Sequence, residues 1–140
     1  MTPSLVLVSY LVREYDEAIA YFTGVLGFRL LEDTPRPHEA PGRRWVRLAP
    51  PSGEAGERGA ALLLARAATP AQTAAIGQQA GGRVWLFLET DDFARDHAAL
   101  SARGVEFLEA PRSESYGTVA VFRDLYGNKW DLIEPSRHAR

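Results

Sequence analysis

The feature that most constrains the fold is a repeat: the two halves of this 140-residue chain show the same order of predicted elements. In the first half, an apolar, β-branched strand over 5–12 is followed by a helix that stops near Gly27 and by a returning strand. In the second half, a strand over 83–89 leads to a helix that stops at Gly104 and again to a strand. Two similar halves predict one architecture used twice.

Side chains at the start of each predicted helix support this order. At the N-cap position, an acceptor side chain satisfies a free backbone N–H group of the first turn. A Glu or Gln three residues later satisfies another. The caps that we predict are Glu14 with Glu17, Thr69 with Gln72, and Asp91 or Asp92. The segment that begins at Thr69 reads as a short linker helix, which Gly81 and Gly82 end.

The remaining strands complete each half. We predict them over 28–32, 44–49 and 60–65 in the first half, and over 105–109, 118–122 and 129–134 in the second. Asp124 and Gly127 suit the turn before the last strand. The expected fold is α+β: two βαβββ modules form a curved mixed or antiparallel sheet around a cavity, with helices outside. We expect a single domain over 1–136, with module one over about 4–66, a linker helix over about 69–80, module two over about 83–134, and a tail over 137–140.

Composition excludes several classes of function. The net charge is −2 and the arginines are scattered, which argues against a nucleic-acid surface. The chain has no cysteine, and therefore no disulfide, thiolate metal site or cysteine nucleophile. No apolar run approaches the roughly 20 residues of a membrane span, and the first residues do not resemble a signal peptide. We expect a cytoplasmic protein with no nucleic-acid or membrane partner.

Five motifs, in order and spacing, carry a resemblance to a known family. They are YDEAIAYF at 15–22, VLGF at 25–28, ETDDF at 89–93, RGVEF at 103–107 and VFRDLYGNKWDLIE at 121–134. Together they resemble the vicinal-oxygen-chelate superfamily, which groups glyoxalase I, extradiol dioxygenases, and bleomycin- and fosfomycin-resistance proteins. Leu125 and Tyr126 depart from the usual turn sequence of this family. The resemblance implies the paired-module fold and a homodimer.

The metal enzymes of that superfamily carry four ligands on inner-facing strand positions. Carried onto this chain, those positions fall at Leu7, within 62–64, at Trp85 and at Asp131. Leucine and tryptophan cannot ligate, so only Asp131 keeps a donor. We therefore expect no metal at the usual site and no other cofactor.

The inner faces are instead expected to be rich in aromatic side chains. Strand alternation places Phe87 and Glu89 with Trp85, and Lys129 and Ile133 with Asp131. The candidate ligand-binding residues are Trp45, Arg47, Trp85, Phe87, Tyr116, Phe122 and Asp131. A cleft of this kind suits a planar organic or cationic molecule, through stacking and a few fixed polar contacts. The alternative is that the aromatic side chains fill the space and leave a closed core.

Three functions remain open at this point. The first is a metal-free binding protein for a small organic molecule, similar to the bleomycin-resistance type. The second is a glyoxalase- or dioxygenase-type enzyme with rearranged ligands drawn from Asp131, Glu89 and His38. The third is an interaction module. No catalytic residue is assigned, although burial would raise the pKa of Asp131 or Glu89 toward the range of a general acid or base. His97 is expected to pack on the outer side of the sheet.

Overall fold

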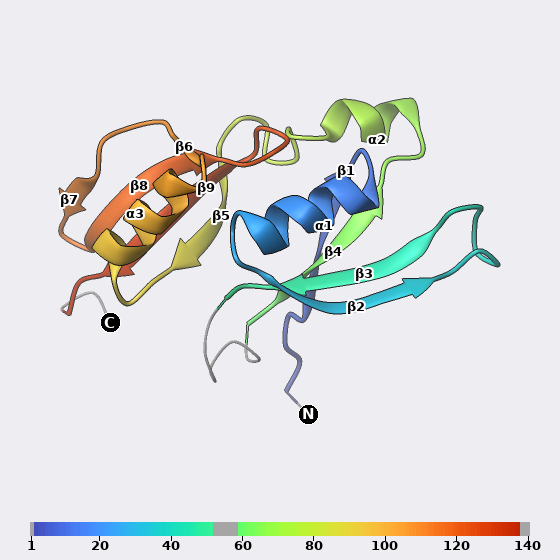
Figure 1. Cartoon of the computed structure of the whole chain (residues 1–140), viewed down its shortest axis with the longest axis horizontal. Coiled ribbons are helices and arrows are strands. Elements are labelled where there is room, and N and C mark those ends of the chain that lie inside the picture. The colour runs from blue at the N-terminus through green and yellow to red at the C-terminus, as the bar shows by residue number, and fades with distance from the viewer. Residues whose placement is uncertain (1, 52–58, 138–140) are drawn as a thin grey trace. The chain divides into compact units, whose positions relative to one another are not determined.

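The chain folds into two compact units, Met1–Ile76 and Gly77–Arg140, each with its own sheet and helix (Figure 1). A computed structural model describes residues 2–51 and 59–137. The division between the units falls within the predicted linker, 69–80. The two curved sheets and few helices confirm the predicted α+β class. His138, in the predicted tail, lies outside the described residues.

A four-stranded sheet and one main helix form the first unit (Figure 1). Its elements are β1 (Leu7–Val12), α1 (Tyr15–Gly24), β2 (Arg29–Pro35), β3 (Arg44–Ala49) and β4 (Ala61–Arg66). The strand order is β1-β4-β3-β2. β1 runs parallel to β4, whereas β3 pairs antiparallel with both β4 and β2. The βαβββ order predicted for the first half is therefore confirmed.

Helix α1 covers one face of this first sheet. Tyr10 of β1 and Phe22 of α1 are fully buried, and their ring centroids lie 5.2 Å apart. Val46 and Leu64 are cross-strand neighbours in β3 and β4 and are buried with them. Because side chains alternate along a strand, the residues between these positions belong to the opposite face.

The ends of α1 differ from the prediction. Glu14 occupies the N-cap position but its side chain makes no capping hydrogen bond, so the capping box predicted there is wrong. Glu17 is paired with Arg13 at 3.1 Å instead. The helix ends at Gly24, before the predicted stop at Gly27. Gly27 has a φ of 75°, which lets Phe28 N donate to Phe22 O at 2.7 Å and starts the return into β2.

A short helix, α2 (Pro70–Ala75), follows β4. Thr69 Oγ1 accepts a hydrogen bond from Gln72 N at 3.1 Å, and Gln72 Oε1 accepts one from Ala68 N at 2.8 Å. The start predicted at Thr69 is therefore confirmed. Within residues 2–51 and 59–137, no helix is long and apolar enough to cross a membrane.

A five-stranded sheet and one helix form the second unit. Its elements are β5 (Val84–Glu89), α3 (Phe93–Ala102), β6 (Glu106–Phe107), β7 (Arg112–Glu114), β8 (Gly117–Arg123) and β9 (Lys129–Pro135). The order is β5-β9-β8-β6, with β7 also paired to β8. β7 was not predicted, and β6 is shorter than the strand expected over 105–109. Pro111 precedes β7, and its missing N–H cannot continue a strand ladder.

Helix α3 covers one face of the second sheet with an aromatic stack. His97 of α3 lies 4.2 Å from Phe107, measured between ring centroids, and Phe107 lies 5.7 Å from Phe122. Phe122 in turn stacks on Trp130, with 5.7 Å between centroids. His97 therefore packs between α3 and the sheet face that this helix covers, as expected for a residue on the helix side of the sheet.

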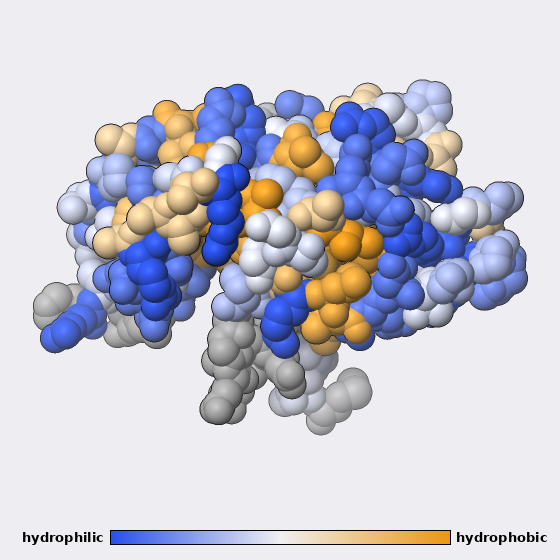
Figure 2. Space-filling model, in the orientation of Figure 1, coloured by the Kyte–Doolittle hydropathy of each residue, from blue (hydrophilic) through white to orange (hydrophobic). Residues whose placement is uncertain are grey.

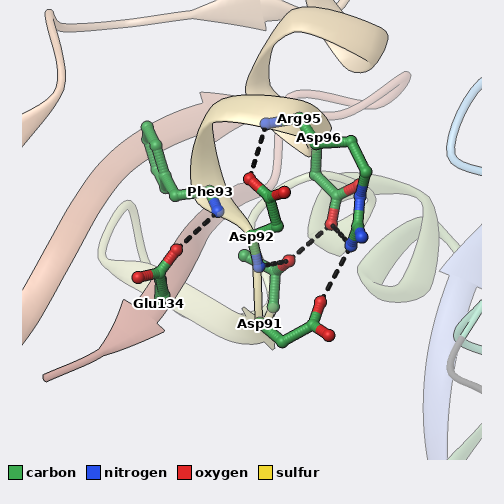
Figure 3. Close-up of polar contacts among 7 residues, drawn as sticks. Asp91, Asp92, Phe93, Arg95, Asp96 and Glu134 are labelled. Atoms are coloured by element: carbon green, nitrogen blue, oxygen red, sulfur yellow. Dashed lines mark hydrogen bonds and ion pairs between the residues drawn. The ribbon is translucent and has the colours of Figure 1, made fainter. Parts of the chain in front are cut away.

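The start of α3 is fixed to strand β9 by a network of polar contacts (Figure 3). Asp92 Oδ1 accepts from Arg95 N at 3.0 Å, which confirms a predicted cap. Glu134 Oε1, at the end of β9, accepts from Phe93 N at 2.7 Å. Arg95 also donates to Asp91 at 2.9 Å and to Asp96 at 3.0 Å. Asp92 and Glu134 thus hold the first turn of the helix, whereas Asp91 pairs with a side chain at the surface, so we read the cluster as structural.

Asp124 organises the turn between β8 and β9. Its Oδ1 accepts from Tyr126 N and Asn128 N, both at 3.0 Å. Its Oδ2 accepts from Trp130 Nε1 at 2.9 Å. The residue is only 6% exposed, so this carboxylate joins the turn to the aromatic stack beneath α3. The predicted bonding of Asp124 to its own turn is confirmed.

We expect Asp124→Ala to destabilise the protein by about 2–4 kcal/mol, because it leaves two backbone donors and the Trp130 indole N–H without their acceptor. Chemical denaturation followed by tryptophan fluorescence measures the change. Asp16→Ala is the control: its side chain is 85% exposed in an ion pair with Arg44, and its loss should cost less than about 1 kcal/mol. Equal losses for the two variants would contradict the structural role assigned to Asp124.

Candidate functional site

The face of the second sheet opposite α3 brings three side chains together. Phe87 of β5 is the register partner of Asp131 in β9, and Asp131 is the partner of Val121 in β8. Directly opposed residues project from the same face of a sheet. Phe87 is 65% exposed and Asp131 is 9% exposed. An open aromatic ring therefore neighbours a buried carboxyl group.

The carboxyl group of Asp131 has an unused acceptor. Its Oδ1 is buried and makes no hydrogen bond to any of the described residues. Buried polar atoms normally have a hydrogen-bond partner, so this oxygen is an exception. Burial raises the pKa of Asp131, the charge of Arg112 opposes that rise, and the charge of Glu109 adds to it. The direction of this shift agrees with the rise expected from the sequence.

Glu109 lies beside Asp131 because of a break in the sheet edge. Leu108 N donates to Val121 O at 2.8 Å, after which the chain leaves the ladder before Pro111. Glu109 Oε2 then accepts from Val121 N at 3.4 Å, where a strand carbonyl would otherwise stand. The break thus places a carboxylate next to the cross-strand neighbour of Asp131.

Arg112 completes the group and donates to two carboxylates. Its Nε donates to Glu109 Oε2 at 2.7 Å, and its Nη1 donates to Glu114 Oε1 at 2.7 Å. These two carboxylates, with the Tyr116 side chain, raise the pKa of Arg112 above its ordinary value. The guanidinium is therefore committed to partners within its own unit.

The sequence did not identify Glu109 and Arg112 as site residues. They are three positions apart around Pro111, where one continuous strand was expected from 105 to 109. A Pro two residues after a glutamate was the available signal that the strand stops there. Which backbone donor the freed glutamate would reach depends on strand pairing, which the local sequence does not encode.

Four of the seven candidate residues belong with this group or near it. Asp131 and Phe87 are neighbours on the face of the second sheet opposite α3, which we call the open face. The Tyr116 side chain interacts with Arg112. Trp85 lies in the same strand as Phe87, at a register shift between Val84 and Leu86. The alternation of side chains between the two sheet faces is interrupted at this shift. The pattern along β5 therefore does not show from which face Trp85 projects.

Phe122 is not part of this group. It is fully buried on the face that α3 covers, stacked on Trp130. The physical reason is strand alternation: Val121 is opposite Asp131, so the next residue, Phe122, projects to the other face. The expectation that Phe122 would share a face with Asp131 is corrected accordingly.

Trp45 and Arg47 lie together in the first unit, on the face opposite α1. Arg47 pairs with Glu32 of β2 in register, and its Nε donates to Glu32 Oε1 at 3.0 Å. The Arg36 guanidinium lies 5.0 Å from the centre of the Trp45 ring. The predicted alternation of Trp45 with Arg47 therefore holds, and both side chains have contacts within this unit.

The residues present do not fit the metal that the superfamily's enzymes use. The strand positions that would supply ligands hold Leu7, the leucines of 62–64, and Trp85, beside Asp131. Within the described part of the chain, no group of three or more His, Cys, Asp or Glu residues could hold a metal ion. The alternative metal site considered from the sequence used Asp131, Glu89 and His38. Glu89 shares the open face with Asp131, whereas His38 belongs to the first unit.

Exposed apolar surface is present in both units. Figure 2 shows hydrophobic surface over the part of the first unit where β2 begins beside the end of β3, bordered by hydrophilic surface. In the first unit Leu5 and Val6 are 72% and 63% exposed, close to the 65% of Phe87 in the second unit, so exposure alone does not single out one site. Phe87 also adjoins a buried carboxyl oxygen that has no partner among the described residues. We therefore place the candidate site at Phe87 and Asp131.

Comparison with known families identifies the class of protein. Residues 4–132 match the family model described as the Glyoxalase/Bleomycin resistance protein/Dioxygenase superfamily. Since this match spans nearly the whole chain, the protein belongs to that superfamily. The resemblance found from the sequence motifs is thereby confirmed.

Individual relatives agree with this assignment. An uncharacterized protein of Shewanella frigidimarina (strain NCIMB 400) is 48% identical over 134 residues, which cover 96% of this chain and 95% of the relative. The crystal structure of TnmS3, an antibiotic-binding protein from Streptomyces sp. CB03234, is 30% identical with a TM-score of 0.73 and covers 96% and 98% of the two chains. The crystal structure of UcmS2 is 26% identical with a TM-score of 0.77 and covers 95% and 98%.

We expect Asp131→Asn to change how stability depends on pH. A carboxyl group whose pKa is raised on folding favours the folded state below its unfolded pKa, and this contribution is lost as pH rises through the folded pKa. The asparagine of the variant has no charge to bury. The variant should therefore match the wild type below pH 3.8, the ordinary pKa of an aspartate, and exceed its free energy of unfolding at neutral pH.

Denaturation at a series of pH values measures this difference. Asp91→Asn is the matched control, because it makes the same chemical change at a side chain that is 89% exposed. The control should shift stability by less than about 0.5 kcal/mol at every pH. A constant offset between Asp131→Asn and the wild type, unchanged by pH, would mean that Asp131 is not buried as described.

Proposed function

We propose that the protein binds a small organic molecule through the open face of the second sheet, without a metal ion. The observation that carries this proposal is the buried Oδ1 of Asp131, which has no partner among the described residues and stands beside the 65%-exposed ring of Phe87. Ligand sites typically combine apolar surface with a few polar groups that fix orientation. A ligand donor would satisfy the oxygen, and an aromatic part of the ligand would cover the ring.

Two comparisons support binding as the activity. TnmS3, whose description is an antibiotic-binding protein, is 30% identical over nearly all of both chains. The superfamily to which this chain belongs includes bleomycin-resistance proteins. We therefore propose sequestration of a small molecule rather than its conversion.

A metal is not required in this proposal. Asp131 alone keeps a donor among the positions that ligate metal in the superfamily's enzymes, and no alternative ligand group is assembled among the described residues. Binding should then be unchanged, to within about twofold, after dialysis against a chelator. A loss of binding that Mn, Fe, Ni or Zn restores would favour the enzyme-type alternative.

Titration with a panel of planar aromatic compounds tests the proposed function. We expect saturable quenching of tryptophan fluorescence by at least one compound, with amide NMR shifts in β5, β8 and β9. Phe87→Ala should weaken this binding by about tenfold, since an aromatic contact contributes about 0.5–1.5 kcal/mol beyond area burial. Silence across the panel would leave the proposal without support.

Leu125→Ala provides the control for that variant. Leu125 is an exposed apolar residue of the same unit, 42% exposed, in the turn between β8 and β9. Removing it should leave affinity unchanged, because it is not part of the proposed site. Equal weakening by both variants would indicate non-specific hydrophobic association.

We also propose that the chain works as a homodimer in the cytoplasm, as the superfamily resemblance suggests. Light scattering coupled to size exclusion measures the mass directly. A mass near 15.4 kDa, that of one chain, at micromolar concentration would contradict the dimer without affecting the binding proposal.

A further inference from the structure

We propose that the ligand is a cationic aromatic compound, whose ammonium or amidinium N–H group donates to Oδ1 of Asp131 while its ring lies against Phe87. This inference rests on the proposed binding function and specifies the chemistry of the ligand. It follows from the charged groups around Asp131 Oδ1 and from the hydrogen bonds that the neighbouring Arg112 makes to carboxylates.

Negative groups outnumber positive ones around Asp131. Glu109 reaches the amide of Val121, the cross-strand neighbour of Asp131, and its charge acts on the Asp131 carboxyl. Glu114 joins the same group through Arg112. Two of these carboxylates bond the Arg112 guanidinium. With Glu89 and Lys129, which strand alternation places on the face of Asp131, four carboxyl groups and two cations are gathered here. Such an arrangement attracts a cation and repels an anion, and the effect is strengthened where the group is partly shielded from water.

Arg112 does not offer a site for an anionic ligand. Its Nε and Nη1 both donate to carboxylates at 2.7 Å, and Tyr116 also interacts with it. A ligand carboxylate that approached Nε or Nη1 would meet Glu109 and Glu114, and the repulsion between like charges would disfavour it. The Oδ1 of Asp131, in contrast, makes no hydrogen bond within the described residues that a donor would have to break.

Phe87 supplies the second half of the recognition. Its ring is 65% exposed and is the register neighbour of Asp131. An aromatic face attracts a cation as well as another ring. A ligand with a ring and a positive group one or two bonds apart would therefore contact both residues at once.

Three probes of one shape and different charge test this inference: naphthylmethylammonium, naphthylmethanol and naphthoate. Amide NMR titration of the wild-type protein gives the affinity for each and the residues that respond. We expect the ammonium to bind about tenfold more tightly than the alcohol, with the naphthoate weakest. The amides of Phe87, Val121 and Asp131 should shift.

Asp131→Asn should reduce the preference of the ammonium over the alcohol to about twofold or less, while the affinity for the alcohol stays within about threefold of wild type. Its melting temperature shows whether it is folded. Asp91→Asn is the charge-matched control, because Asp91 belongs to the network at the start of α3, and it should keep the full preference.

The outcomes separate this inference from the function on which it rests. If naphthoate or the alcohol binds as tightly as the ammonium, the cationic ligand is ruled out while binding itself stands. The same conclusion follows if Asp131→Asn weakens all three probes equally. If no probe binds and the broader aromatic panel is also silent, the proposed function fails with the inference.

Discussion

The packing of one sheet face against one helix governs both units of this protein. Each sheet lays one face against a single helix, α1 or α3, and the core residues of that face are apolar. Tyr10 with Phe22, and Phe122 with Trp130, show how completely the covered faces are filled. Because side chains alternate, the opposite faces carry the remaining residues and are free to hold polar groups. The Asp131 carboxyl group occupies such a position, on a strand with neighbours on both sides.

The second unit is organised around two aspartates of opposite character. Asp124 accepts three hydrogen bonds, which join the β8–β9 turn to the aromatic stack. Asp131, on the strand that follows that turn, is also buried but keeps Oδ1 without a partner among the described residues. A buried carboxyl oxygen left open reduces stability. The proposed ligand would satisfy this oxygen next to an exposed phenylalanine, since function commonly costs stability at such positions.

The sequence predicted most of the fold because its signals were local. Strand alternation, the Thr69 start of α2, the Asp92 cap and the Asp124 turn each depend on residues close together in the chain. Predictions failed where the answer depended on pairing. Glu14 and Glu17 have the right spacing for a cap, yet Glu17 pairs with Arg13. Phe122 was grouped with Asp131 by proximity in the hairpin, whereas the register sets it on the other face. Glu109 and Arg112 could not be assigned to the site from the sequence, because their positions depend on the break in the strand ladder before Pro111.

A crystal structure of the protein with a bound aromatic cation is the most direct measurement of the central claim. We predict the ligand nitrogen within about 2.7–3.2 Å of Asp131 Oδ1, with its ring against Phe87 and with Arg112 still bonded to Glu109 and Glu114. A ligand bound elsewhere, or an Asp131 Oδ1 that is paired with another group of the protein itself, would contradict this claim.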